Sequence, residues 1–70
     1  MLPLTMIDIG ETAEIKKIGG KDEVRRHLAE LGFVVGETIT AVSSLNGNLI
    51  LQVKDSRVAL DQTLAQRIYI

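Results

Sequence analysis

The stretch RRHLAELGFVVGETI, residues 25–39, decides the fold because its apolar period changes at Gly32. Upstream of this glycine, three apolar residues share one helix face with the spacing i, i+4, i+7: Val24, Leu28 and Leu31. A short helix is therefore expected over residues 23–31, with Asp22 as its cap. Gly32 has the freedom that the left-handed turn after a helix requires. The stretch thus predicts a helix that ends sharply and leads into a strand.

On both sides of this stretch the apolar residues alternate, as they do in strands. Five short strands are expected, over residues 12–18, 38–42, 49–53, 57–60 and 67–70. In the first strand, Lys17 is expected to occupy a bulge. The Asn46-Gly47 pair predicts a type I′ hairpin, because both central residues of that turn need positive φ. A second tight turn is expected at Asp55-Ser56, and Asp61 is expected to cap one helical turn over residues 63–66.

Strands this short bury their inner face only if the sheet closes on itself. The sequence therefore predicts a mainly β protein, a small five-stranded barrel with a short α-helix inserted after the first strand. A chain of 70 residues is long enough for one domain, which is expected to span residues 1–70. Hydrophobic residues make up 46% of it, which supports a core even at this size.

The charge balance and the cysteine count restrict the functional classes. Eight Lys and Arg residues face nine Asp and Glu residues, and the net charge of −1 provides no general attraction for phosphates. The absence of cysteine excludes disulfides and thiolate metal sites. No apolar run approaches the roughly 20 residues of a membrane span, and Met1–Thr5 lacks the pattern of a signal peptide. A cytoplasmic location without membrane insertion is expected.

The side chains needed for catalysis are not grouped in any known motif. His27 is the only histidine, and Ser43, Ser44 and Ser56 lie at strand ends or in turns without a nucleophile elbow. Gly19-Gly20-Lys21 lacks the spacing of a phosphate-binding loop. The protein is therefore expected to be no enzyme and to use no cofactor. It should act by binding another molecule.

Two alternatives to a protein-binding role remain open. Glu23 and His27 lie one helical turn apart and could both touch a metal, although zinc takes three or four ligands. A metal-sensing domain is one alternative. A small barrel that binds nucleic acid is the other, and it would use five basic residues: Lys16, Lys17, Lys21, Arg25 and Arg26. With one Phe, one Tyr and no Trp, the chain offers few rings for stacking on bases, so we expect no nucleic-acid partner.

The order of the segments resembles the FeoA family over nearly the whole chain. The resemblance is carried by residues 25–39, by the Asn-Gly hairpin, and by residues 57–61 leading into 65–70. Leu4 and residues 9–11 look like the first turn of that family. This resemblance implies an SH3-like barrel. It also implies a free-standing cytoplasmic accessory protein of bacterial ferrous iron uptake, which contacts the cytosolic part of the membrane GTPase FeoB without chemistry of its own. Similar domains occur in iron-dependent repressors.

The helix and the loop after it are the expected partner-binding surface. The residues assigned to this surface are Arg25, Arg26, Glu30, Phe33 and Val34. An exposed apolar pair beside two arginines would form a compact docking patch. This fold would also allow weak self-association through an uncovered strand edge.

Overall fold

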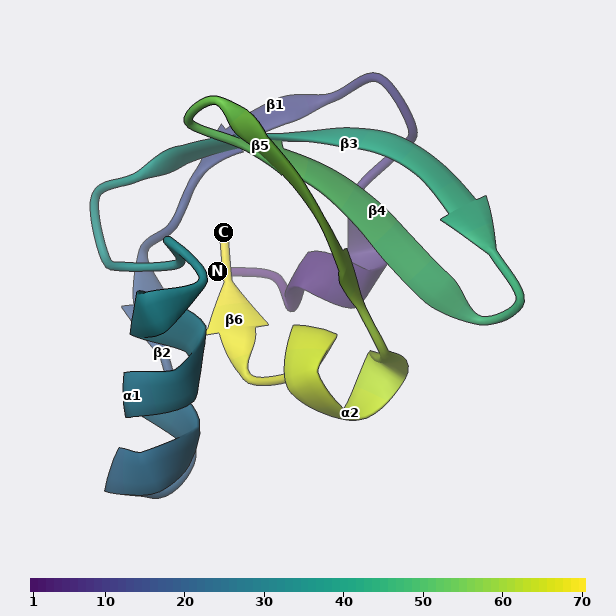
Figure 1. The fold of residues 1–70 in the computed structure, drawn as a ribbon. Helices are drawn as coiled ribbons and strands as arrows, with labels where there is room; N and C mark the ends of the chain where they lie inside the picture. The colour runs from purple at the N-terminus through teal and green to yellow at the C-terminus, as the bar shows by residue number, and fades with distance from the viewer.

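The computed structural model describes residues 1–70 as two antiparallel sheets, two α-helices and one 3₁₀ turn (Figure 1). The elements follow in the order η1 (Leu4–Met6), β1 (Thr12–Glu14), β2 (Lys17–Ile18), α1 (Asp22–Glu30), β3 (Thr38–Leu45), β4 (Asn48–Val53), β5 (Ser56–Leu60), α2 (Gln62–Ala65) and β6 (Ile68–Tyr69). The larger sheet has the strand order β1-β3-β4-β5, and β2 pairs with β6 in the smaller one. The mainly β class with one inserted helix is confirmed. No helix is long and apolar enough to cross a membrane.

The first predicted strand is two strands, so the structure has six strands where five were expected. Ile15, which is fully buried, is the point of change. Its N–H donates to the carbonyl of Glu37, beside the larger sheet, at 2.9 Å. The next N–H, that of Lys16, donates to the carbonyl of Tyr69 in the smaller sheet at 2.7 Å. The chain therefore changes sheets between these two residues, and no bulge at Lys17 is needed.

Both tight hairpins are formed, one as predicted and one shifted by a residue. Asn46 has φ +53° and Gly47 has φ +81°, as the type I′ turn requires. The second turn was expected at Asp55-Ser56, but Val53 pairs with Ser56, so Lys54 and Asp55 are its central residues. Strand β3 also runs three residues beyond its predicted end. A register shift between Ala41 and Ser43 interrupts the alternation there, and this hid the continuation of the strand.

Both helices end within one residue of their predicted ends, and the predicted N-cap is wrong for α1 but confirmed for α2. Asp22 is the first residue of α1, and the cap position is occupied by Lys21, whose side chain makes no capping bond. In α2 the predicted cap is confirmed, because Oδ1 of Asp61 accepts a hydrogen bond from the N–H of Leu64 at 2.9 Å. This helix begins and ends one residue before its predicted bounds.

The turn that ends α1 lies close to Val53 of the larger sheet. Gly32 has φ +104°, and a Cβ at this position would lie 3.3 Å from Cγ2 of Val53. The N–H of Phe33 then donates to the carbonyl of Leu28 at 2.9 Å, which turns the Phe33 ring inward. The core consists of twelve buried residues, all apolar: Leu4, Ile7, Ile15, Leu28, Phe33, Ile39, Ala41, Leu51, Val53, Leu60, Ala65 and Ile68.

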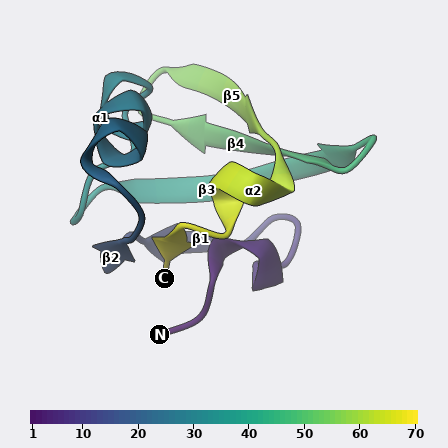
Figure 2. The same cartoon turned by 90° about the horizontal axis from the view of Figure 1, so that it is seen from below.

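The two chain ends lie close together, as the marked termini in Figure 2 show, and they pair through backbone hydrogen bonds. The N–H of Leu2 donates to the carbonyl of Ile70 at 2.9 Å, and the N–H of Ile70 donates to the carbonyl of Leu2 at 2.7 Å. Pro3 forms a bridge with Tyr69. The N-terminal segment therefore adds a third extended piece beside β6, on the side away from β2.

Candidate functional site

The helix–loop surface consists of the exposed residues of α1 and the loop that follows it. Arg25, Arg26 and Glu30 are exposed on α1, as expected for a contact surface. Val34 is 40% exposed at the start of the loop. Phe33 was assigned to this surface, and that assignment is wrong because its side chain is fully buried. The backbone bond that ends α1 turns Phe33 into the core, so it cannot touch a partner.

Val35 belongs to the helix–loop surface, and the sequence-based assignment missed it. Its side chain is 63% exposed. The N–H of Glu37 donates to the carbonyl of Val34 at 3.1 Å and closes a tight turn in which Gly36 has φ +93°. A second bond, from the N–H of Gly36 to the carbonyl of Ile15, ties this turn to the barrel. Val34 and Val35 are therefore held outward by backbone bonds on a fixed loop. The sequence did contain a signal for this turn, because Gly36 is the residue type that such turns need at their third position.

The charges on the helix–loop surface are only partly neutralised. Arg25 forms an ion pair with Asp22 one turn earlier. The other ion pairs of the protein join Lys16 with Glu14 and Lys54 with Glu37. Arg26 and Glu30 take part in none of them, so both charges remain free to meet a partner.

The five basic residues of the nucleic-acid alternative do not form a free cationic surface. Carboxylates neutralise Lys16 and Arg25. The ammonium of Lys17 lies 5.8 Å from the centre of the Tyr69 ring, so this ring already has a cation beside it. Lys21 and Arg26 remain unpaired. This arrangement differs from the interleaved rings and cations of single-strand binding sites.

The metal alternative has two ligands on one exposed helix face and no third. Glu23 and His27 are both exposed on α1. No group of three or more His, Cys, Asp or Glu side chains comes together in a geometry that could hold a metal ion. The two residues alone fall short of the coordination number of a protein zinc site.

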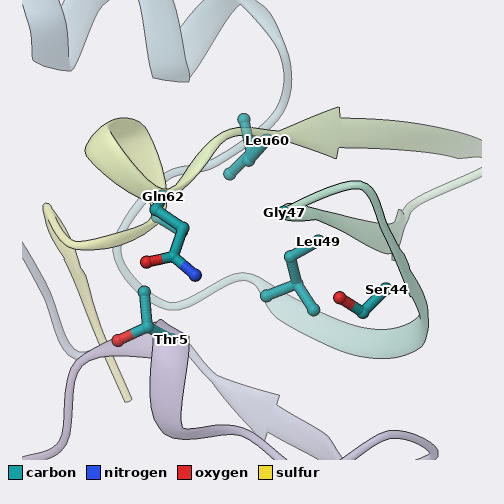
Figure 3. A pocket seen from close by; sticks show the side chains of 7 residues that line it. Thr5, Ser44, Gly47, Leu49, Leu60 and Gln62 are labelled. Atoms are coloured by element: carbon teal, nitrogen blue, oxygen red, sulfur yellow. The ribbon is translucent and has the colours of Figure 1, made fainter.

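A small cleft opens between η1, the β3–β4 hairpin and α2 (Figure 3). Its interior holds about 70 Å³, and seven residues line it: Thr5, Ser44, Gly47, Leu49, Leu60, Gln62 and Ala65. None of them can act as a general acid or base near neutral pH. Pockets for small molecules are several times larger, at roughly 300–1,000 Å³. The cleft therefore has neither the groups nor the size of a catalytic site.

Comparison with known proteins assigns the whole chain to one family. The sequence profile of the FeoA domain family matches residues 2–70. A protein of Methanocaldococcus jannaschii that is named as an Fe(2+) transport protein A is 29% identical to this chain over 70 residues. The match covers 100% of this chain and 85% of that protein.

Two solved structures agree in fold. The crystal structure of an iron uptake regulatory protein, FeoA, superimposes with a TM-score of 0.88 at 30% identity, covering 96% of this chain and 89% of that one. The FeoA of Stenotrophomonas maltophilia, described as an SH3 domain protein in complex with zinc, has a TM-score of 0.84 at 28% identity and covers 99% and 88% of the two chains. The family profile, the relative and both structures lead to one assignment: this chain is a member of the FeoA domain family, with an SH3-like fold.

Proposed function

We propose that this protein is an accessory protein of ferrous iron uptake. In this proposal it binds the cytosolic part of a FeoB-type membrane GTPase and modulates it without catalysing a reaction of its own. Membership of the FeoA domain family, whose similar members are named for Fe(2+) transport and iron uptake, supports the link to iron uptake. The absence of acid–base groups from the one cleft supports a binding role. The protein would then act at the cytoplasmic face of the membrane.

The observation that carries the proposal is the pair of outward valines on the loop that follows α1, together with two unpaired charges on α1 itself. Val34 and Val35 are held on a fixed loop, so they lose little conformational entropy when a partner covers them. Arg26 and Glu30, with no internal ion partner, can meet opposite charges on the GTPase. Apolar anchors surrounded by charged residues are typical of the centre and rim of protein interfaces.

Calorimetric titration against the isolated cytosolic part of the GTPase tests the proposal. We expect Val35→Glu to weaken binding by at least about tenfold, because it places an unpaired charge at the centre of the contact. Leu45→Glu is the matched control. Leu45 is 63% exposed, the same fraction as Val35, but it lies at the far end of β3. Leu45→Glu should therefore leave the affinity for the GTPase unchanged.

The charges provide a second, independent comparison. Arg26→Glu should weaken binding, whereas Arg57→Glu makes the same charge change on β5 and should not. Absence of binding at high micromolar concentrations of both proteins would contradict the proposed function. Equal losses for Val35→Glu and Leu45→Glu would contradict the assignment of the helix–loop surface.

A further inference from the structure

Strand β5 forms an open edge of the larger sheet. In the strand order β1-β3-β4-β5, its only neighbour is β4. Figure 2 shows β5 at the top of the sheet with no strand beyond it. The edge contains neither proline nor a bulge, and its register with β4 is continuous from Ser56 to Leu60. It therefore lacks two of the features by which proteins prevent edge-to-edge pairing.

The hairpin turn determines which backbone groups of β5 point outward. Val53 and Ser56 flank the two-residue turn, so they are the pair whose carbonyl and N–H close it. Bonded and non-bonded pairs then alternate along an antiparallel ladder. It follows that Val58 and Leu60 bond to β4, whereas the N–H and C=O of Arg57 and Ala59 face the open side. Outside the ladders, no backbone hydrogen bond involves any of these four groups.

The open edge continues to Asp61. This residue has φ −72° and ψ 170°, an extended conformation, and its N–H donates to no backbone carbonyl. Arg57, Ala59 and Asp61 alternate along the strand, so their side chains lie on the same face of the sheet, and all three are exposed. The edge thus presents three N–H groups in line, with a cation at one end, a methyl group in the middle and an anion at the other end.

We propose that β5 pairs with β5 of a second copy of this chain, antiparallel and about a two-fold axis at Ala59. In this register the two Ala59 residues lie opposite each other. Arg57 of each copy lies opposite Asp61 of the other copy, which gives two such pairs. The two Ala59 residues exchange both backbone bonds. The N–H of each Asp61 donates to the carbonyl of Arg57 across the axis. Only one carboxylate oxygen of Asp61 is engaged in capping α2, so Oδ2 is available to the guanidinium.

Charge selects this register over its neighbours. A two-fold axis at Arg57 would place two guanidinium groups directly opposite each other. An axis at Val58 would place Asp55 opposite Asp61. Like charges in directly opposed cross-strand positions destabilise a sheet, whereas opposite charges stabilise it. The axis at Ala59 is the symmetric register that pairs opposite charges and keeps the free N–H groups aligned with free carbonyls.

The dimer should be weak, because one short strand pairs on each side. Such an interface is much smaller than the standard size of stable complexes, so we expect a dissociation constant on the order of 0.1–1 mM. Sedimentation velocity over this range of concentrations measures it. We expect Arg57→Glu to remove detectable dimer over this range of concentrations, since two opposite-charge pairs become like-charge pairs. Arg26→Glu, the same change on α1, should leave the dissociation constant unaltered. A chain that stays monomeric at roughly 1 mM overturns the proposal.

Complementary variants test the register itself. Arg57→Glu and Asp61→Lys should each fail to self-associate, whereas their equimolar mixture should form heterodimers. In the mixed dimer the introduced glutamate meets the introduced lysine, and the Asp61 kept by one chain meets the Arg57 kept by the other. Circular dichroism of Asp61→Lys checks that loss of the cap leaves the barrel folded. Ala59→Pro, which removes the central N–H donor of the proposed pairing, is a second variant that should not self-associate. Association that survives Arg57→Glu or Ala59→Pro, or a mixture that stays monomeric, overturns the pairing.

Nuclear magnetic resonance locates the contact. The amide signals of Arg57, Ala59 and Asp61 should shift with protein concentration, while those of the helix–loop surface should not. Concentration-dependent shifts confined to residues 34–35 would instead assign self-association to that surface and overturn the proposal. Binding to the GTPase through the helix–loop surface is a separate property, and Arg57→Glu distinguishes the two because it should abolish only self-association.

Discussion

Replacing Gly32 with alanine tests whether the close approach of α1 to the sheet constrains this position. The new Cβ would lie 3.3 Å from Cγ2 of Val53, and φ is +104°. Alanine in left-handed backbone costs about 1–2 kcal/mol, of which a less flexible unfolded chain offsets roughly 0.4–1 kcal/mol. Overpacking against Val53 adds about 1 kcal/mol or more. We therefore expect a destabilisation of about 2 kcal/mol, which lowers Tm by roughly 8–16 °C in a domain of this size.

The hairpin glycine provides the matched control. Gly47 has φ +81°, and a Cβ there would meet nothing within 4 Å. Gly47→Ala should therefore show the backbone cost alone, about 1 kcal/mol or less. Urea and thermal unfolding followed by circular dichroism measure both variants. In a Val53→Ala background, Gly32→Ala should cost about 1 kcal/mol less, because the contact is gone. Equal effects of the two glycine variants, or no coupling to Val53, would refute the steric argument.

Three further changes test the core, the cap and the paired termini. Phe33→Ala should lower the free energy of unfolding by about 3–5 kcal/mol and leave the domain largely unfolded at 37 °C. Val35→Ala should stay within about 0.5 kcal/mol of the parent, as measured by urea unfolding. Similar effects of the two variants would contradict the opposite orientations of the two side chains. Asp61→Ala removes the bond to the N–H of Leu64 and should cost about 1 kcal/mol by thermal unfolding, with an unchanged Tm arguing against the cap. Deletion of residues 1–3 removes the pairing with β6 and should lower Tm by several degrees, whereas a truncated chain that melts at the parent temperature would show that this pairing contributes nothing.

Features set by a few neighbouring residues could be predicted from the sequence. The turn at Asn46-Gly47, the glycine that ends α1 and the cap at Asp61 each depend on local backbone conformation, and each is confirmed. The family resemblance agreed with the fold as well. In these places one residue type fits the required conformation much better than the others, so the sequence pattern is informative.

Features that depend on distant partners could not be predicted. The change of sheets after Ile15 depends on Tyr69 lying beside Lys16, and the pattern of residues 12–18 contains nothing of that. The same holds for the contact surface. Phe33 and Val35 are both apolar residues between two glycines. The bond from the N–H of Phe33 to the carbonyl of Leu28 goes with a buried side chain, whereas the turn that follows holds Val35 outward.

The reciprocal bonds between Leu2 and Ile70 make this barrel suited to circular permutation. Because residues at the two ends are adjacent partners in one ladder, a short glycine linker can join them without crossing the barrel. New ends can then be opened in the exposed turn between Asn46 and Gly47, whose residues contribute no side chain to the core. For the same reason the domain can be inserted into a surface loop of a host protein, since the two points where it would join the host lie side by side.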